Sequence, residues 1–298
     1  MIENFSDLLK KAKETGPYVV SVAQAEDNEL LKSIKMAEEM GLIHPILVGD
    51  KSKIEHIAKE VGLTNYEIVH NSNPDEVALE AVKVVSSGQA QILMKGLVNT
   101  STYLRAVLNR AYGLRTDRLL SLLAVYELPG YHKLLYCTDS GVNVNPTLEQ
   151  KKHILTNSLI ALKSFGFDAP KVAVLSSNEM VDPKIPSTVD AARLVEMVKE
   201  GLIPNCIIEG PIAFDVAFEP HAASHKGIDS KITGDVDLLM FPNIETGNVL
   251  GKSWLHFNNA KWAGIILGGT NPIVLGSRSD TADVKLNSIA LACLASKR

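Results

Sequence analysis

Cysteine is scarce in this chain, and its positions form no ligand or disulfide pattern. The 298 residues include only three cysteines, Cys137, Cys206 and Cys293, far apart in apolar or small-residue surroundings. No CxxC pair and no Cys/His spacing typical of a metal site occurs. We therefore expect buried free thiols and no structural zinc site.

Long apolar runs and a basic excess are also missing. No apolar run approaches the roughly 20 residues that span a membrane, and residues 1–11 read as an amphipathic helix without the apolar core of a signal peptide. Lys and Arg number 30 against 34 Asp and Glu, a net charge of −4. These absences argue against nucleic-acid and membrane partners and predict a cytoplasmic protein.

What the chain does have is a regular alternation of short β-branched runs and helical periodicity. Strands are expected at Pro17–Ala23, Ile92–Met94 and Lys171–Leu175, and helices at Asn28–Met40 and Ser187–Lys199. This pattern favours parallel sheets covered by helices on both faces, with ligands at the carboxyl ends of strands. Further strands are expected at 45–48, 67–70, 133–137, 207–208 and 238–241, and further helices at 74–85, 102–110 and 146–165.

The last turn of the chain has the residues of an anion site. A strand-like run, Ile273–Leu275, is followed by helical spacing over Thr281–Ala295, so Ser277 to Asp280 form the turn between them. The helix amino terminus, the Arg278 guanidinium and the Ser277 hydroxyl suit a phosphate. The alternative for this turn is ordinary helix capping by Ser279, Asp280 or Thr281, with Asp283 favourable to the helix dipole.

A second polar turn follows the strand Ile92–Met94 and leads to Arg105. Its Gly96 permits close approach of the backbone to a ligand, and its hydroxyls and Asn99 can either cap a helix or bind phosphate oxygens. The candidate ligands in this segment are Lys95, Asn99, Thr100, Thr102 and Arg105.

Two more polar turns follow later strands. In 138–146, Asn145 and Pro146 suit the start of a helix, which is a sufficient structural explanation for that pair. Asp139 and Asn143 have no such explanation and are candidates for binding a ligand. The stretch 242–248, which ends in Gly247 and Asn248, indicates a turn that opens towards a helix.

Together these motifs resemble the phosphate acetyltransferase and phosphate butyryltransferase family. The resemblance covers the chain from about residue 17 and rests on collinear segments, Met94–Val98, Asp139 with Asn143–Pro146, Phe214–Phe218, Phe241–Asn248 and Ser277–Arg278. The butyryl enzymes are resembled more closely, at Met94–Thr100, Gly113–Thr116, Ile185–Thr188 and Ser277–Asp280.

The resemblance implies an α/β fold of two three-layer domains with mostly parallel sheets and an interdomain cleft, like isocitrate and isopropylmalate dehydrogenases. Domain I is expected at 1–133 plus 276–298, and domain II at 134–275. The implied reaction is butanoyl-CoA plus phosphate giving butanoyl phosphate plus CoA, by direct transfer in a ternary complex. It also implies a homodimer or higher homo-oligomer that acts in butyrate metabolism and fermentation. No metal or other cofactor is implied, since CoA, acyl-CoA, acyl phosphate and inorganic phosphate are substrates.

The family pattern also implies roles for single residues. Ser277 and Arg278 would be catalytic, Arg105 would bind phosphate or acyl phosphate, and Asp283 would be the general base, with Asp280 as the alternative. An aspartate near pKa ~3.9 that takes a thiol proton near ~8.5 faces a gap of roughly 6 kcal/mol. Partial desolvation would raise the pKa of the carboxyl, and the helix terminus with Arg278 would lower the pKa of the thiol, so both effects would narrow the gap. The remaining implied substrate-binding residues are Lys95, Asn99, Thr100, Thr102, Asp139, Asn143, Gly247 and Asn248.

Other functions stay open at this point. A phosphate acetyltransferase of the same family would share every motif, and a non-catalytic sensor of CoA or phosphate would be expected to lack the Ser277–Arg278 pair, which is present. A metal-dependent dehydrogenase would need clustered aspartates, whereas Asp235 and Asp237 indicate turn chemistry. A serine hydrolase is disfavoured because no GxSxG occurs.

Overall fold

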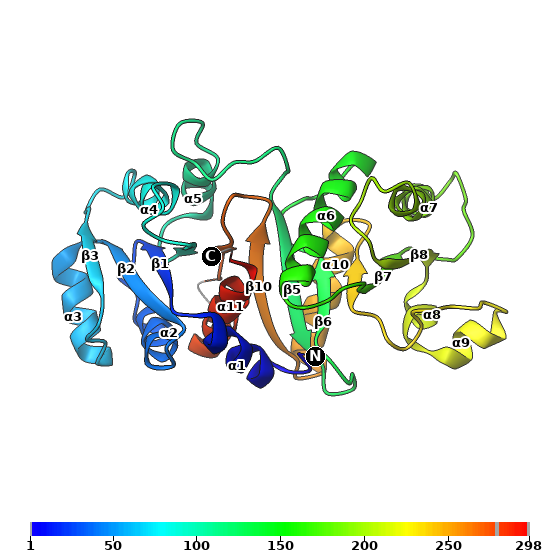
Figure 1. The fold of residues 1–298 in the computed structure, drawn as a ribbon, viewed down its shortest axis with the longest axis horizontal. Helices are drawn as coiled ribbons and strands as arrows, with labels where there is room; N and C mark the ends of the chain where they lie inside the picture. Colours follow the sequence, from blue (N-terminus) through cyan, green and yellow to red (C-terminus); the bar gives the residue numbers. More distant parts are fainter. Residues whose placement is uncertain (1, 278–279, 297–298) are drawn as a thin grey trace. The chain divides into compact units, whose positions relative to one another are not determined.

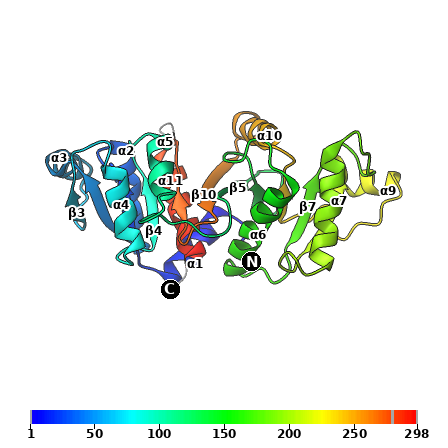
Figure 2. The same cartoon turned by 90° about the horizontal axis from the view of Figure 1, so that it is seen from above.

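The chain divides into two compact units, which we describe separately. The computed structural model describes residues 2–277 and 280–296 (Figures 1 and 2). We call the first the terminal unit, made of Asn4–Arg118 and the chain from Ala263 onward. The second, the central unit, consists of Leu119–Trp262 and the short N-terminal stretch up to Glu3.

The changes between units fall after Arg118 and after Trp262, whereas the sequence analysis put them after residues 133 and 275. Strand pairing accounts for the earlier positions. The strand β5 (Ser121–Glu127) pairs antiparallel with β6 (Leu135–Thr138) inside the central unit. At the other change, residues after Trp262 belong to a strand that pairs within the terminal unit.

The terminal unit is an α/β sandwich built on a mostly parallel sheet. Its strands lie in the order β3-β2-β1-β4-β11-β10, all parallel except β10. Its elements are α1 (Phe5–Thr15), β1 (Tyr18–Ala23), α2 (Asn28–Glu39), β2 (Ile43–Gly49), α3 (Lys51–Val61), β3 (Glu67–His70), α4 (Val77–Ser86), β4 (Ile92–Lys95), α5 (Thr100–Val107), β10 (Lys261–Leu267), β11 (Ile273–Val274) and α11 (Ala282–Ala295).

Helices cover both faces of this sheet because the chain reverses direction across it. From β1 the chain moves outward through β2 to β3, and it then returns past β1 to β4. Right-handed crossovers put α2 and α3 on one face and α4 on the other. Contacts agree with this arrangement, since α2 packs on α3 and α11 while α4 packs on α5.

Local capping fixes the helix that follows β1. The Asp27 side chain accepts a hydrogen bond from the Leu30 amide at 2.7 Å and so starts α2. After α2 the backbone turns at Gly41, whose φ of 75° favours glycine. The sequence predicted this helix correctly, and it also predicted β3 at its observed bounds.

The strands of the central unit lie in the order β5-β6-β9-β7-β8 and are parallel, except that β5 is antiparallel to β6. Figures 1 and 2 show α6 and α10 on opposite faces of the sheet that these strands form. Besides β5 and β6, its elements are α6 (Leu148–Ser164), β7 (Lys171–Leu175), α7 (Pro186–Lys199), β8 (Ile207–Ile212), α8 (Phe214–Phe218), α9 (Pro220–His225), β9 (Leu238–Met240) and α10 (Ile244–Phe257).

The start of α6 differs from the prediction. Asn145 and Pro146 were expected to begin it, but the N-cap is Thr147, whose hydroxyl accepts from the Gln150 amide while the Gln150 side chain accepts from the Thr147 amide. This reciprocal capping box satisfies two amides, more than an asparagine cap would. Asn145 and Pro146 therefore belong to the loop before the helix.

A network of charges joins the starts of three central strands. The buried Lys133 ammonium, just before β6, lies 2.6 Å from carboxylate oxygens of both Asp235 and Asp237. Asp235 also pairs with Lys171 at 2.7 Å and contacts His132 at 3.0 Å. These aspartates thus bind lysines at the opposite edge of the sheet from the carboxyl ends of the strands.

Burial raises the pKa of Asp235, but hydrogen bonds from Lys133, Lys171 and His132 outweigh it and hold that pKa well below its ordinary value. A carboxylate of this kind stabilises the fold above its unfolded pKa near ~3.9 and loses that contribution as the pH falls towards its folded pKa.

We expect Asp235→Asn to lower the free energy of unfolding at pH 7 by about 1 kcal/mol, a small value because the side chain is 44% exposed. The deficit against the wild type should shrink below about pH 4. Urea unfolding at pH 7 and pH 3 measures it. Glu149→Gln, at an exposed i,i+3 pair, is the matched control, and a deficit at pH 3 as large as that at pH 7 would contradict the assignment.

Candidate active site

Two loops leave the sheet of the terminal unit side by side. The strands β4 and β11 are parallel neighbours, with Leu93 opposite Ile273 and Met94 opposite Val274. The loops that follow them, 96–99 and 275–277, therefore emerge at the same carboxyl edge, where ligands bind in such sheets. Two motifs about 180 residues apart in the sequence meet through this one pairing.

The first of these loops is held against the end of β1. The Gly96 amide donates to the Ala23 carbonyl at 2.8 Å, and the Leu97 amide donates to the Gln24 carbonyl at 2.9 Å. A Cβ at Gly96 would lie 2.2 Å from the Gln24 carbonyl oxygen. Glycine is thus required at this position because the two backbones approach closely. This reason is independent of the ligand contact proposed for Gly96 from the sequence.

Lys95 and Ser277 line the same small cavity. Lys95 is buried, and its ammonium donates to the Gly96 carbonyl at 3.2 Å. The cavity has a volume of about 10 Å³ and is also lined by Asp27, Gly276 and Lys285. It holds at most about one water molecule, so it is too small to contain a substrate.

The turn after β11 closes on itself through Asp280. The Ser277 amide donates to the Asp280 carboxylate at 2.7 Å, and the Asp280 amide donates back to the Ser277 carbonyl at 3.2 Å. Thr281 is the N-cap of α11 and accepts from the Val284 amide at 3.4 Å. Of the three expected capping alternatives, Thr281 is thus the cap, while Arg278 and Ser279 lie outside the described residues.

The two candidate bases have different surroundings. Asp280 is half-buried, and burial raises the pKa of its carboxyl, against the opposing effects of the Ser277 amide and the Lys285 charge. Asp283 lies exposed in the first turn of α11. Desolvation of the carboxylate, one of the two effects expected to narrow its pKa gap to a thiol, is therefore found at Asp280.

Lys285 was not singled out from the sequence. It is a buried cation on the mostly apolar α11, and its ammonium donates to the Asp280 carbonyl. The charge also acts on Glu29, in the first turn of α2. A lone lysine inside a run of buried helical positions was the signal that could have identified it.

The remaining candidates of the terminal unit lie on or just before α5. Asn99 stands at the N-cap position, but its side chain makes no capping hydrogen bond, and both Asn99 and Thr100 are exposed. Thr102 and Arg105, one helical turn apart, share a face of the helix, with Arg105 exposed. Ordinary capping therefore does not account for Asn99.

In the central unit, Asp139 organises the loop after β6. One of its carboxylate oxygens accepts from the Gly141 and Val142 amides at 2.8 and 3.0 Å, and the other accepts from the Asn143 side chain at 2.6 Å. Asn143 also donates to the Leu120 carbonyl at 2.9 Å. Burial raises the pKa of Asp139, and these N–H groups oppose the rise.

Asp139 and Asn143 thus have a structural role, to hold the loop after β6, which the sequence did not reveal. They hold the loop by side-chain hydrogen bonds to its own amides, as aspartate and asparagine commonly do in turns. Their binding of substrate stays a prediction.

Gly247 and Asn248 lie inside α10 and not in a turn before it. A Cβ at Gly247 would lie 2.5 Å from the Phe241 ring and 2.7 Å from the Ser140 Cβ. The Asn248 side chain donates to the Ser140 carbonyl at 3.3 Å. The structure therefore brings Asp139, Asn143, Gly247 and Asn248 together as one support for the loop after β6.

Cysteine chemistry has no support here. All three cysteines are buried free thiols, as the sequence predicted. Burial raises the pKa of Cys137 well above its ordinary value and that of Cys206 and Cys293 to about 12, which suppresses the nucleophilic thiolate. Among the described residues, no group of three His, Cys, Asp or Glu could hold a metal ion, and none of their helices is long and apolar enough to cross a membrane.

Comparison with known proteins agrees with the fold and the motifs. The model of the family described as "phosphate acetyl/butaryl transferase" matches residues 59–293, and the chain belongs to this family. The phosphate butyryltransferase of Clostridium beijerinckii is 43% identical and aligns with 100% of this chain and 99% of its own. The phosphate acetyltransferase of Rhizobium meliloti is 38% identical, over 99% of this chain and 94% of its own.

Solved structures confirm the fold class. A branched-chain phosphotransacylase from Enterococcus faecalis V583 superposes with a TM-score of 0.82 at 32% identity, covering 94% of this chain and 99% of that one. A putative 4-hydroxythreonine-4-phosphate dehydrogenase from Salmonella typhimurium has a TM-score of 0.59 at 12% identity, with 94% of this chain and 100% of that one covered. The dehydrogenase likeness, which concerns the fold alone, is as predicted.

We expect Lys285→Met to loosen the turn that contains Ser277 and Asp280, because a hydrogen bond to a charged group contributes about 1.5 to 3 kcal/mol. Turnover should fall by about tenfold or more. With the lysine charge gone, the pKa of Asp280 rises further, so an acidic limb of the pH–rate profile due to Asp280 should move to higher pH.

The measurement is a pH–rate profile of both proteins, with Lys252→Met, at an exposed position of α10, as the control. If turnover falls but the acidic limb of the pH–rate profile stays at the same pH, the titrating group is not Asp280 but another group, such as Asp283. Unchanged turnover would mean that Lys285 does not hold the turn.

Proposed function

We propose that the chain is a phosphate butyryltransferase, which interconverts butanoyl-CoA and phosphate with butanoyl phosphate and CoA. The observation that carries the proposal is the 43% identity to the Clostridium beijerinckii enzyme of that name over the whole length of both chains. The Ser277–Asp280 turn at the carboxyl edge of a parallel sheet supports it, since anionic substrates bind at such helix-opening turns.

In the proposed mechanism the acyl group passes directly between the two substrates. The CoA thiolate attacks the carbonyl carbon of butanoyl phosphate, a carbon–sulfur bond forms, and the collapse of the tetrahedral intermediate breaks the carbon–oxygen bond to release phosphate. In the other direction a phosphate oxygen attacks the thioester and CoA leaves. Holding both reactants at attack distance replaces a bimolecular encounter.

Each candidate residue has a task in that scheme. The Ser277 hydroxyl and nearby amides would stabilise the oxyanion, and Arg278 and Arg105 would neutralise phosphate charge. The base would take the thiol proton. What supports Asp280 for this task is its partial burial and raised pKa, whereas Asp283 is favoured by its place along the sequence.

The proposal extends to the setting of the enzyme. Lys95, Asn99, Thr100 and Thr102 would bind substrate from the terminal unit, and Asp139, Asn143, Gly247 and Asn248 from the central one. Turnover would need no metal or bound cofactor. A homodimer or higher homo-oligomer, a cytoplasmic location and a role in butyrate fermentation belong to the same proposal.

A phosphate acetyltransferase is the second candidate, supported by the 38% identity to the Rhizobium meliloti enzyme. The two candidates differ only in the acyl group, and one methylene in an apolar pocket changes discrimination by about 1 to 3 kcal/mol. The third, a sensor that binds CoA or phosphate without turnover, fits poorly because the Ser277–Arg278 pair is retained.

We expect free-thiol release from acyl-CoA to depend on phosphate and to be greatest for butyryl-CoA in an acetyl-to-hexanoyl series. Each methylene is worth about tenfold or more in such a pocket, so the maximum should be clear. The assay runs in chelator, with and without phosphate. A maximum at acetyl-CoA would assign the acetyl enzyme, release without phosphate would indicate a thioesterase, and binding without release would indicate a sensor.

We expect Arg278→Ala to reduce turnover by about 30- to 1000-fold, the equivalent of ~2 to 4 kcal/mol for a charge stabiliser in the transition state. Initial rates over a range of butanoyl phosphate concentrations measure it. Arg193→Ala is the control, since the Arg193 guanidinium pairs with Glu196 and Glu200 along α7. Turnover within twofold of the wild type would remove Arg278 from the mechanism.

A further inference from the structure

The central unit contains a large cavity, and none of the catalytic or substrate-binding candidates named from the sequence lines it, although three of the segments that carry the family resemblance contribute to its wall. Its volume is about 680 Å³, within the range of small-molecule sites. It lies where α10 passes the carboxyl ends of β7 and β9, so that the residues after β7, Ser176 and Ser177, and Pro242 after β9 form part of its wall. Parallel sheets bind ligands at this edge.

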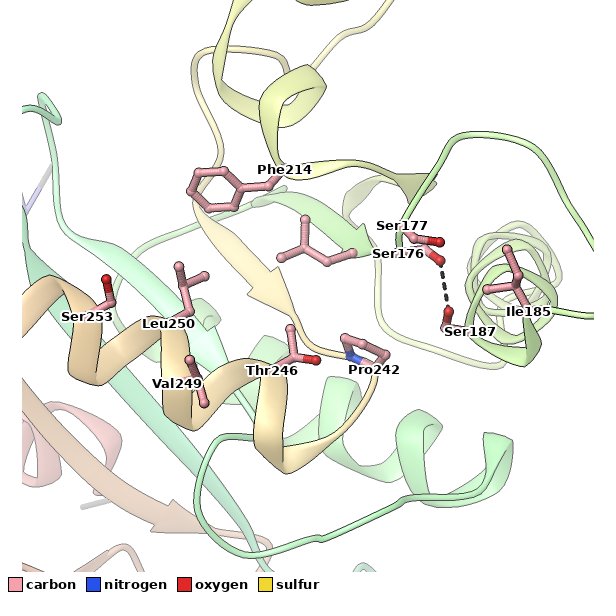
Figure 3. A pocket seen from close by; sticks show the side chains of 11 residues that line it. Ser176, Ser177, Ile185, Ser187, Phe214, Pro242, Thr246, Val249, Leu250 and Ser253 are labelled. Atoms are coloured by element: carbon pink, nitrogen blue, oxygen red, sulfur yellow. Dashed lines mark hydrogen bonds between the residues drawn. The ribbon is translucent and has the colours of Figure 1, made fainter.

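One face of α10 is turned to the cavity. Thr246, Val249, Leu250 and Ser253 line it and recur at the spacing of a single helical face (Figure 3). Val249, a branched apolar side chain, is 68% exposed. This face therefore offers apolar surface that the chain itself does not cover.

The other face of α10 prevents rotation of the helix about its own axis. A Cβ at Gly251 would lie 2.2 Å from the Tyr126 hydroxyl oxygen, and one at Gly247 would meet Phe241 and Ser140. Because both glycines are in close contact with their neighbours, the rotation of α10 is fixed. The stripe that includes Val249 is thus held in place before any ligand arrives.

The polar groups of the cavity are concentrated on one side. The Ser176 and Ser187 hydroxyl oxygens lie 2.8 Å apart, and Ser177 lies beside them (Figure 3). Away from these serines, Figure 3 shows the Phe214 ring and Leu250 on facing walls. Phe214 is 42% exposed and packs one side of its ring near Phe218, at a centroid distance of 4.7 Å.

The lining also restricts the charge of a ligand. Among the described residues that line the cavity, no side chain carries a charge. A phosphate group placed there would lose its hydration without gaining a cation, which is costly. The occupant must be an uncharged group with apolar faces and one hydrogen-bonding edge.

We propose that this cavity binds the adenine end of the CoA substrate, an inference that rests on the proposed function. Adenine is uncharged at neutral pH and planar, and its amino group and ring nitrogens lie at the edge. Its faces would contact Phe214 and the Val249–Leu250 stripe, and its edge would exchange hydrogen bonds with the serine hydroxyls. The pantetheine arm fits less well, because its two amides and its hydroxyl are spread along a chain and not gathered at one side.

The test compares a CoA thioester with one that lacks the nucleotide. Val249→Trp fills the cavity from an exposed helical position and leaves the glycine face of α10 unchanged. Ile160→Trp places the same indole at a partly exposed branched residue of α6 that does not line the cavity and serves as the control. Both variants and the wild type are assayed for phosphate-dependent thiol release from butyryl-CoA and from butyryl-pantetheine.

We expect Val249→Trp to lower kcat/KM for butyryl-CoA by about tenfold or more, mainly through KM, as for lost uniform binding. Its kcat/KM for butyryl-pantetheine should stay within about twofold of the wild type, and Ile160→Trp should leave both values unchanged. Adenosine 3′,5′-bisphosphate should inhibit the wild type competitively against butyryl-CoA and should inhibit Val249→Trp more weakly.

Two outcomes would overturn the proposal. Equal losses for both thioesters would put pantetheine or the acyl chain in the cavity, and no loss for either would mean that CoA does not use it. Failure of the proposed function is a separate result, because the wild type would then release no thiol in response to phosphate from either thioester.

Discussion

The parallel pairing of β4 with β11 is the constraint on which the terminal unit depends. It joins two segments about 180 residues apart and sends their loops out of the sheet at one edge. The pairing alone would not fix the loops, however. Gly96 must have no side chain so that its loop can reach the end of β1, and the buried Lys285 must hold the carbonyl of Asp280. The position of Ser277 thus depends on backbone contacts and on one buried cation.

The central unit follows a related rule with different parts. There the loop after β6 is organised by the buried carboxylate of Asp139, and α10 is brought against it by the absence of a side chain at Gly247. In both units a charged side chain below the surface bonds to main-chain groups of a loop, and a glycine permits close packing beside it. Buried polar groups of this kind are stable because their hydrogen bonds are satisfied within the loop.

Much of the fold was predictable because its elements have strong local signals. The β-branched runs at Lys171–Leu175 and Glu67–His70 predicted strands with the observed bounds, and the helical periodicity of 28–40 predicted α2. The helix α3 was missed although Asp50 caps it, and β5 was missed although its run is apolar. The start of α6 was misplaced because the reciprocal pair of Thr147 and Gln150 outweighs a plausible Asn-Pro start.

The site was predictable only where residue type indicates chemistry without knowledge of packing. Ser277 and Asp280 were identified as part of a turn, and the structure joins them there. Gly247 was taken for a turn residue, since a glycine needed for contact between a helix and a loop looks the same in a sequence. Lys285 and the cavity beside α10 depend on which helix face meets which neighbour, and that information is absent from any local window.

The terminal unit is built from two stretches of chain that are far apart in the sequence, and this affects how the protein can fold during synthesis on the ribosome. Its last sheet neighbours, β10 and β11, and its last helix, α11, are the final elements to be made. Nearly all of the central unit is contiguous and complete before them, so it can fold while the terminal unit still lacks the strand beside β4. The apolar edge of β4 and the face that α11 covers stay open during that interval, and the nascent chain is then most exposed to aggregation and most in need of chaperones.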